Sequence, residues 1–123
     1  MTRVDQFEPA HLRAKLGTAK GAERSRIWIE GKRLADAGFT AGRYYLRTDL
    51  GNERGPVWRL ELVGEEDVVT EMPRTVSGRR DKPIIDITGR DVFEAFGRLG
   101  THVDVWFYDG AIEIQPAEDA AHG

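Results

Sequence analysis

The sequence contains no cysteine among its 123 residues. Disulfide bonds, thiolate nucleophiles and cysteine-ligated zinc sites are therefore excluded. No apolar run approaches the roughly 20 residues that a membrane-spanning helix needs, and the N-terminus lacks the apolar core of a signal peptide. These absences predict a soluble, cytoplasmic protein without a membrane partner.

Enzyme signatures are equally scarce. The three histidines, His11, His102 and His122, are too far apart in the sequence to show a metal-ligand spacing. No glycine-rich loop ends in the Lys-Ser or Lys-Thr pair of a phosphate-binding loop. The segment "DITG" at 86–89 differs from the Asp-Thr-Gly of aspartic proteases because Ile87 intervenes. We therefore expect no catalytic residue, no metal and no cofactor.

Charge is divided unevenly along the chain. Residues 1–63 hold 12 Lys and Arg against 8 Asp and Glu, whereas residues 64–123 hold 6 against 13. The two parts thus carry charges of +4 and −7, which sum to the net charge of −3. This distribution excludes a uniformly basic surface for nucleic acid and leaves room for a basic face on one side.

What the sequence does contain is a repeated pattern. Residues 27–39 read "IWIEGKRLADAGF" and residues 85–97 read "IDITGRDVFEAFG", at a constant offset of 58. The first, third and fifth positions are Ile, Ile and Gly in both segments. Alternating apolar residues followed by glycine predict a short strand that stops at the glycine, and the residues after it are typical of one or two helical turns.

Each repeat is followed by a predicted hairpin. In the first half, strands are expected near residues 44–50 and 57–63. In the second half, an Asp-Gly pair at 109–110 predicts a two-residue turn. Such a turn sets Phe107 opposite Ile112 and Val105 opposite Ile114, so these four apolar side chains should share the inner face.

The resulting prediction is one mainly β domain with short helices. Residues 1–25 are interpreted as an N-terminal arm or short helix, residues 26–63 and 84–115 as two units, residues 64–83 as their connector and residues 116–123 as an acidic tail. A strand within the connector is expected near residues 68–69 or 75–76. The predicted core consists of Ile27, Ile29, Leu34, Phe39, Leu60, Leu62, Ile85, Ile87, Val92, Val105, Phe107, Ile112 and Ile114.

The segment "IWIEGKRLADAGFTAGRYYL" resembles the SymE-like branch of the AbrB superfamily, whose signature is an apolar strand, Gly-Lys or Gly-Arg, an aliphatic residue, Ala-Gly-Phe and a further glycine. The second half resembles the same unit more loosely. The stretch "RTVSGRRDKPIIDI" is also similar to small segments associated with phage-type DNA cytosine methyltransferases. The positions that carry the first resemblance are Ile27, Ile29, Gly31, Lys32, Leu34, Ala37, Gly38, Phe39 and Gly42.

The resemblance implies an AbrB-like swapped-hairpin barrel, which in that superfamily is normally a homodimer with one unit per chain. This chain carries two β-α-β-β units, so we expect two pseudo-symmetric halves in one barrel, as a monomer with an internal pseudo-dimer or a weak homodimer. It further implies a small DNA-binding or DNA-associated accessory or regulatory protein of phage or mobile-element type.

Basic residues of the first half and the connector are the predicted nucleic-acid contacts, because loops of this composition can follow a phosphate backbone. A solvated charged face is the alternative interpretation for any one of them. The predicted contacts are Arg24, Arg26, Lys32, Arg33, Arg79, Arg80 and Lys82.

A second hypothesis is a protein-partner module that modulates or inhibits a nucleic-acid enzyme, such as a methyltransferase or host defence complex, without binding nucleic acid itself. The acidic second half favours it, since an acidic surface can occupy a basic nucleic-acid channel. Trp106 and Tyr108, on the outward row of the last hairpin, are its predicted partner-binding residues. The alternative is that the N-terminal segment covers them as a second layer of core.

Overall fold

The computed structural model describes residues 10–18, 24–51, 55–64 and 73–117. These residues form short helices and many strands, so the predicted mainly β fold with short helices is confirmed. In chain order the elements are β1 (Ala10–Lys15), β2 (Gly17–Thr18), β3 (Ser25–Glu30), α1 (Lys32–Asp36), β4 (Tyr44–Asp49), β5 (Trp58–Val63), β6 (Arg74–Thr75), β7 (Ser77–Arg79), β8 (Lys82–Gly89), α2 (Arg90–Val92), η3 (Phe93–Gly97, a π-helix), β9 (His102–Tyr108) and β10 (Ala111–Pro116).

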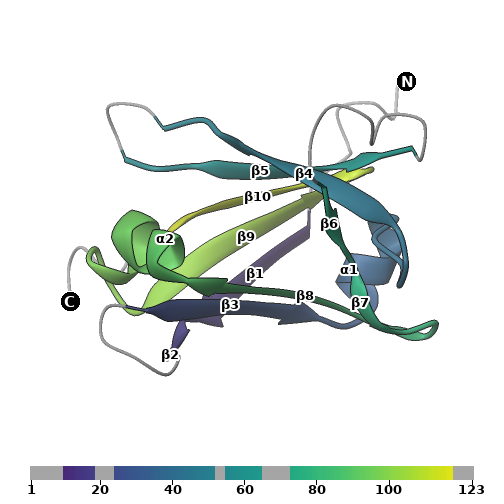
Figure 1. Cartoon of the computed structure of the whole chain (residues 1–123), viewed down its shortest axis with the longest axis horizontal. Coiled ribbons are helices and arrows are strands. Elements are labelled where there is room, and N and C mark those ends of the chain that lie inside the picture. Colours follow the sequence, from purple (N-terminus) through teal and green to yellow (C-terminus); the bar gives the residue numbers. More distant parts are fainter. Residues whose placement is uncertain (1–9, 19–23, 52–54, 65–72, 118–123) are drawn as a thin grey trace, which may run out of the picture.

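The strands form two antiparallel sheets. One sheet has the order β1-β9-β10-β5-β4-β6 and the other the order β2-β3-β8-β7. The sheets enclose the core, with α1 at one end of the molecule and α2 at the other (Figure 1). The described strands thus form two separate sheets and do not close into a single barrel.

The two repeated segments lie side by side, as β3 and β8 of the four-stranded sheet. Ile27 pairs with Ile87, and Ile29 pairs with Ile85. All four side chains are buried, because alternation places them on the same, inner face of the sheet. Each strand stops at a glycine of positive φ, and a helix follows directly.

The predicted register of the last hairpin is confirmed. Phe107 lies opposite Ile112 and Val105 opposite Ile114, and all four are buried. Strand β10 also pairs with β5, which sets Leu60 opposite Ile112 in the middle of the six-stranded sheet. The two hairpins are therefore joined directly through their second strands.

The chain passes between the sheets at two corners. Leu16 connects β1 with β2, and Val76 connects β6 with β7; both are buried. The Leu16 backbone N–H donates to the Thr101 carbonyl oxygen at 2.8 Å. Equivalently, the Val76 N–H donates to the Arg43 carbonyl oxygen at 2.9 Å. Each corner thus buries one aliphatic side chain, and the backbone N–H of that same residue keeps a hydrogen-bond partner.

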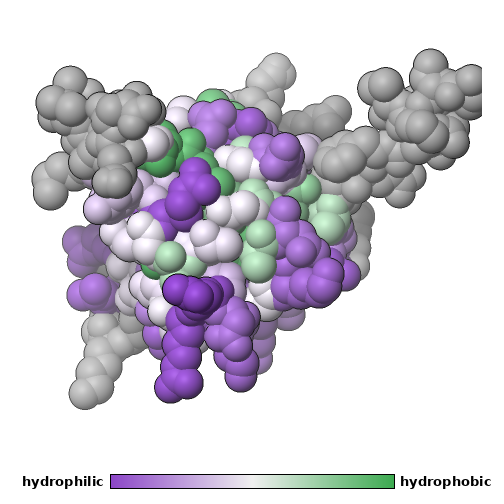
Figure 2. All heavy atoms as spheres, turned by 90° about the vertical axis from the view of Figure 1, so that its right-hand side faces the viewer, coloured by the Kyte–Doolittle hydropathy of each residue, from purple (hydrophilic) through white to green (hydrophobic). Residues whose placement is uncertain are grey.

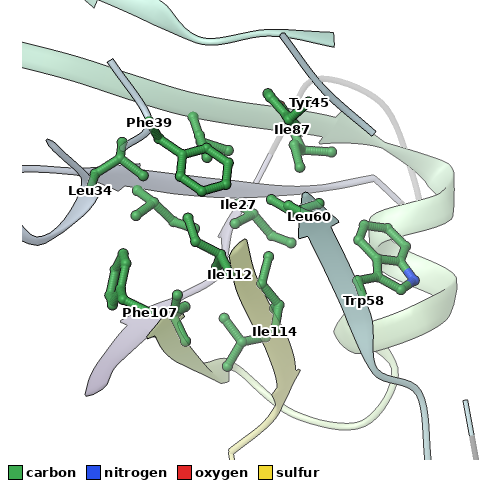
Figure 3. Close-up of a cluster of buried hydrophobic side chains, with 14 of the residues drawn as sticks. Ile27, Leu34, Phe39, Tyr45, Trp58, Leu60, Ile87, Phe107, Ile112 and Ile114 are labelled. Carbon is green, nitrogen blue, oxygen red and sulfur yellow. The ribbon is translucent and has the colours of Figure 1, made fainter. Parts of the chain in front are cut away.

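The core lies between the two sheets. Side chains from both sheets point toward one another there, among them Ile27, Leu60 and Ile112 (Figure 3). Of the 13 residues predicted for the core, Leu62 is only partly buried, and the other 12 are buried. Tyr45, Trp58, Val76 and Phe96 also belong to it.

Two sequence-based expectations about local structure were wrong. Residues 10–15 form strand β1, not a helix, because pairing six residues with β9 satisfies more backbone groups than a helix of one and a half turns. The segment "SGRRDKP" is a tight β7–β8 hairpin and not an open loop. Within the connector, β6 begins at Arg74, close to the expected second position. The alternative strand position at residues 68–69 lies outside the described residues, as does residue 118 onward of the tail.

Candidate nucleic-acid interface

The β7–β8 hairpin presents three of the predicted basic contacts. Arg79 and Lys82 form the last pair of the ladder, and Arg80 lies in the turn; all three are exposed. Gly78, with φ +91, makes this turn possible, because a Cβ there would overlap the Lys82 carbonyl oxygen. The hairpin therefore holds its cations on a constrained backbone.

Helix α1 brings two further cations to the same end of the sheet. Glu30 at the end of β3 pairs with Ile84 near the start of β8, so Lys32 and Arg33 follow at the end where the β7–β8 turn lies. We define the basic cluster as the five residues that these elements contribute: Lys32, Arg33, Arg79, Arg80 and Lys82. Figure 2 shows this end of the molecule, with hydrophilic side chains around a less polar centre.

The basic cluster is only weakly neutralised. Lys32 Nζ lies 3.2 Å from Asp36 Oδ2, one helical turn away and largely exposed. Such surface pairs contribute little and break readily. In the part of the chain that the structure describes, Arg33, Arg79, Arg80 and Lys82 have no ion pair, although Asp81 lies in the turn between them. The cluster can therefore donate to phosphate without first losing a strong partner.

Arg24 and Arg26 do not belong to this cluster. Arg26 donates two hydrogen bonds to Asp86, at 2.9 and 2.8 Å, and its guanidinium lies 4.5 Å from the centre of the Trp28 ring. The Arg26 hydrogen bond holds the pKa of Asp86 below its ordinary value. Arg24 precedes β3, whose six residues separate it from α1 by about 20 Å. Of the seven predicted contacts, the structure thus brings five together in the basic cluster and places Arg24 and Arg26 elsewhere.

Trp106 and Tyr108 are both half-buried. The His11 ring of β1 stacks on the Trp106 ring, with centroids 4.3 Å apart. One face of Trp106 is therefore covered by the N-terminal strand, as the second-layer interpretation expects. Its Nε1 is buried and has no hydrogen-bond partner among the described residues. Tyr108 instead borders a hollow beside α1.

Asp104 is a buried carboxylate that the sequence reasoning missed. It accepts hydrogen bonds from Arg13 Nε at 3.0 Å and from His11 Nε2 at 2.9 Å. Burial alone would raise the pKa of Asp104, but these two partners outweigh it and lower the pKa. Its outward position on the hairpin predicted exposure. Only the pairing of β1 with β9 reveals that Asp104 is covered.

Two adjoining hollows lie beside α1, between this helix and β1. One has a volume of about 400 Å³ and is bordered by Ala10, Phe107 and Tyr108. The other has a volume of about 390 Å³ and is bordered by Leu12 and Glu30. Arg33 and Asp36 border both hollows. The surface beside the basic cluster is therefore concave and is lined by both charged and apolar side chains.

Among the residues that the structure describes, no three His, Asp or Glu side chains are grouped closely enough to hold a metal ion. No helix of the described segments is long and apolar enough to cross a membrane. No protein-family model, curated protein or solved structure matches the chain.

Proposed function

We propose that this chain is a small DNA-binding or DNA-associated accessory protein of phage or mobile-element type, and that the basic cluster contacts the phosphate backbone. The observation that carries the proposal is the β7–β8 hairpin, which holds Arg79, Arg80 and Lys82 exposed at one end of the molecule. Helix α1 adds Lys32 and Arg33 beside it. Five cations on two constrained elements suit contact with several successive phosphates.

We further propose that the fold is a duplicated, AbrB-like swapped-hairpin arrangement. Trp28 lies opposite Asp86, which is the equivalent position 58 residues later. Strand β1, in the arm that precedes the first unit, pairs with β9 of the second unit, and β6, in the connector that precedes the second unit, pairs with β4 of the first. This exchange of strands supports two interlocked halves within one chain, as a monomer or a weak homodimer.

The alternative proposal is a module that binds a nucleic-acid enzyme without touching nucleic acid. It is supported by the cations that acidic partners already neutralise on the sheet surfaces, such as Arg26 by Asp86 and Arg59 by Glu113, the latter at 2.7 Å. These pairs confine any DNA contact to a small part of the surface. The basic cluster favours DNA, so the partner module stays second.

Fluorescence anisotropy with a labelled DNA duplex at two salt concentrations tests the first proposal. The intact protein should bind at low salt and lose affinity as salt rises. Arg79→Ala with Arg80→Ala should lower the salt slope by about 2, because each lost phosphate contact removes roughly 0.9.

The matched control removes two positive charges elsewhere, through Lys15→Ala with Arg24→Ala. Both side chains are exposed and lie outside the basic cluster. This variant should bind DNA like the intact protein. Absence of binding by the intact protein at low salt would end the DNA proposal, and equal losses in both double variants would reduce it to a nonspecific charge effect.

A further inference from the structure

Trp28 is an exposed aromatic side chain on the outer face of the four-stranded sheet. It lies on β3 between Ile27 and Ile29, and because alternation points these two into the core, Trp28 points away from it. Trp28 is 39% exposed, and the other large hydrophobic side chains exposed among the described residues, Leu50 and Leu99, are aliphatic. The ring is therefore a flat apolar surface that solvent reaches.

Neighbouring polar groups hold the Trp28 ring in place. The Arg26 guanidinium lies over the ring, 4.5 Å from its centre, and is itself fixed by two hydrogen bonds to Asp86 at 2.9 and 2.8 Å. Two residues further along β3, Glu30 Oε2 accepts a hydrogen bond from Trp28 Nε1. A side chain that is ordered before binding loses less conformational entropy when a ligand binds. The arrangement therefore suits a binding platform.

Trp28 shares its face of the sheet with part of the basic cluster. It lies opposite Asp86 of β8, and alternation places Lys82 on the same outer face as Asp86. The four positions from Lys82 to Asp86 correspond to about 13 Å along the strand. Lys82 is paired with Arg79 across the β7–β8 hairpin. One extended strand of nucleic acid can therefore reach both the cations of this hairpin and the Trp28 ring.

The surroundings of the ring favour a base over a phosphate. Glu30 and Asp86 place carboxylates beside it, and the neighbouring Arg26 is already paired with Asp86. A phosphate at this point would meet a negative surface, whereas a nucleobase is uncharged and offers a π-face that stacks on an aromatic ring. Within a duplex the bases already stack on one another, so only an unpaired base can lie flat on Trp28.

We propose that the preferred ligand of the basic cluster is single-stranded DNA, with phosphates on the cluster and one unpaired base stacked on Trp28. This inference rests on the DNA proposal and adds the form of DNA that is bound. A single strand gains a stacking contact that a duplex of the same sequence lacks.

Fluorescence anisotropy of the full chain tests this preference, with a labelled single strand of about 12 nucleotides and with the same strand annealed to its complement. At about 0.15 M salt, where charge contributes less, the intact protein should bind the single strand with a Kd at least about threefold lower. Trp28→Leu keeps an apolar side chain but removes the π-face. It should raise the single-strand Kd at least about fivefold and change the duplex Kd less than about twofold. Trp28→Phe retains a ring and should keep the single-strand Kd within about threefold of the intact protein.

Tryptophan emission reports the stacking directly. The single strand should quench the emission of the intact protein, because a stacked base lies against the exposed Trp28 ring. Trp28→Phe should abolish this quenching while anisotropy still detects binding. The matched control Trp106→Phe removes a half-buried tryptophan of the other sheet and should leave the quenching unchanged.

Several results would overturn the inference and leave the DNA proposal standing. They are equal or tighter binding of the duplex by the intact protein, a single-strand Kd that Trp28→Leu does not change, equal losses for both forms of DNA in that variant, and quenching that persists in Trp28→Phe. Absence of binding to either form of DNA, even at low salt, would instead end the DNA proposal and this inference with it.

Discussion

The two ends of the molecule are built from the same repeated pattern but are filled differently. At the α2 end, the Trp58 and Phe96 rings pack edge to face with centroids 4.9 Å apart. Arg47 lies over Trp58 at 4.1 Å and donates to Asp91 at 2.7 Å. Aromatic packing and an ion pair thus cover this end. The α1 end instead retains two hollows and an Arg33 without a described ion pair.

Single residues at equivalent positions account for much of this difference. Asp91 is the residue equivalent to Arg33, because the two repeats are offset by 58 positions. Helix α2 therefore carries a negative charge where α1 carries a positive one. The order Gly38-Phe39 is also reversed, as Phe96-Gly97. Phe39 packs against Tyr45, with ring centroids 6.1 Å apart, whereas Phe96 reaches Trp58. The repeat therefore specifies the strand and the glycine at which it ends. The differences at these equivalent positions determine which end is covered by aromatic packing and an ion pair.

Removing the aromatic seal should have the largest effect. Phe96→Ala should cost about 3–5 kcal/mol of unfolding free energy, because the side chain is buried and its loss leaves a cavity against Trp58. Urea denaturation measures it. Lys32→Ala at the α1 end is the control and should change stability by less than about 0.5 kcal/mol. Similar small losses in both variants would contradict the contrast between a sealed and an open end.

The two turns beside α1 should differ in their tolerance of a side chain. Gly78→Ala should lower the unfolding free energy by about 2–4 kcal/mol. The new Cβ would overlap backbone atoms, and alanine at positive φ would add backbone strain. Gly110→Ala should cost about 1–2 kcal/mol, since φ is +82 but no atom lies within 4 Å of a Cβ there. The unfolding free energies of the two variants check the difference. Equal costs would mean that the β7–β8 hairpin relaxes, so the basic cluster would not be rigidly held.

The ion pairs at the two ends should differ in how strongly their contribution to stability depends on pH. Burial alone would raise the pKa of Asp91, but Arg47, the Val92 N–H and the charge of Arg74 together outweigh it and lower the pKa. Its contribution is therefore complete above the ordinary value of 3.8 and is lost as pH falls through the lowered pKa. Asp91→Asn should cost about 1 kcal/mol at pH 7, because solvent screens this partly exposed pair.

Asp36→Asn is the matched change at the α1 end, where the Lys32–Asp36 pair is more exposed. It should cost less than about 0.5 kcal/mol at any pH. In stability measurements from pH 7 to pH 3, the difference between the Asp91→Asn variant and the intact protein should begin to narrow below pH 3.8. A gap that stays constant at low pH would show that the asparagine disturbs packing rather than charge.

The register of the last hairpin was predictable from the sequence because alternation and an Asp-Gly turn determine it locally. The pairing of Phe107 with Ile112 follows from residues only five apart in the chain. The partner of β1 did not follow, since residues 10–15 pair with a strand about 90 residues away. Nonlocal pairing is invisible to a local pattern.

The candidate site shows the same limit. The composition of "SGRRDKP" identified the cations of the hairpin, and the structure places Lys32 and Arg33 at the same end. Arg26 belonged to the predicted set because its partner, Asp86, is 60 residues away and becomes adjacent only when β3 pairs with β8. The hollows beside α1 had no sequence signal, since they depend on how α1, β1 and the β9–β10 turn diverge.

The smallest expected effect on stability comes from giving the α1 end the charge of the α2 end. Arg33→Asp should change the unfolding free energy by less than about 0.5 kcal/mol, because Arg33 is exposed and has no described ion pair to lose. The new carboxylate at position 33 would also find no counterpart of Arg47, the partner of Asp91. The position equivalent to Arg47, 58 residues later, is the buried Val105. DNA affinity should fall in this variant while the stability measured by urea denaturation stays the same. A marked loss of stability would show that Arg33 holds α1 in place, and the open end would then be structural rather than available for ligands.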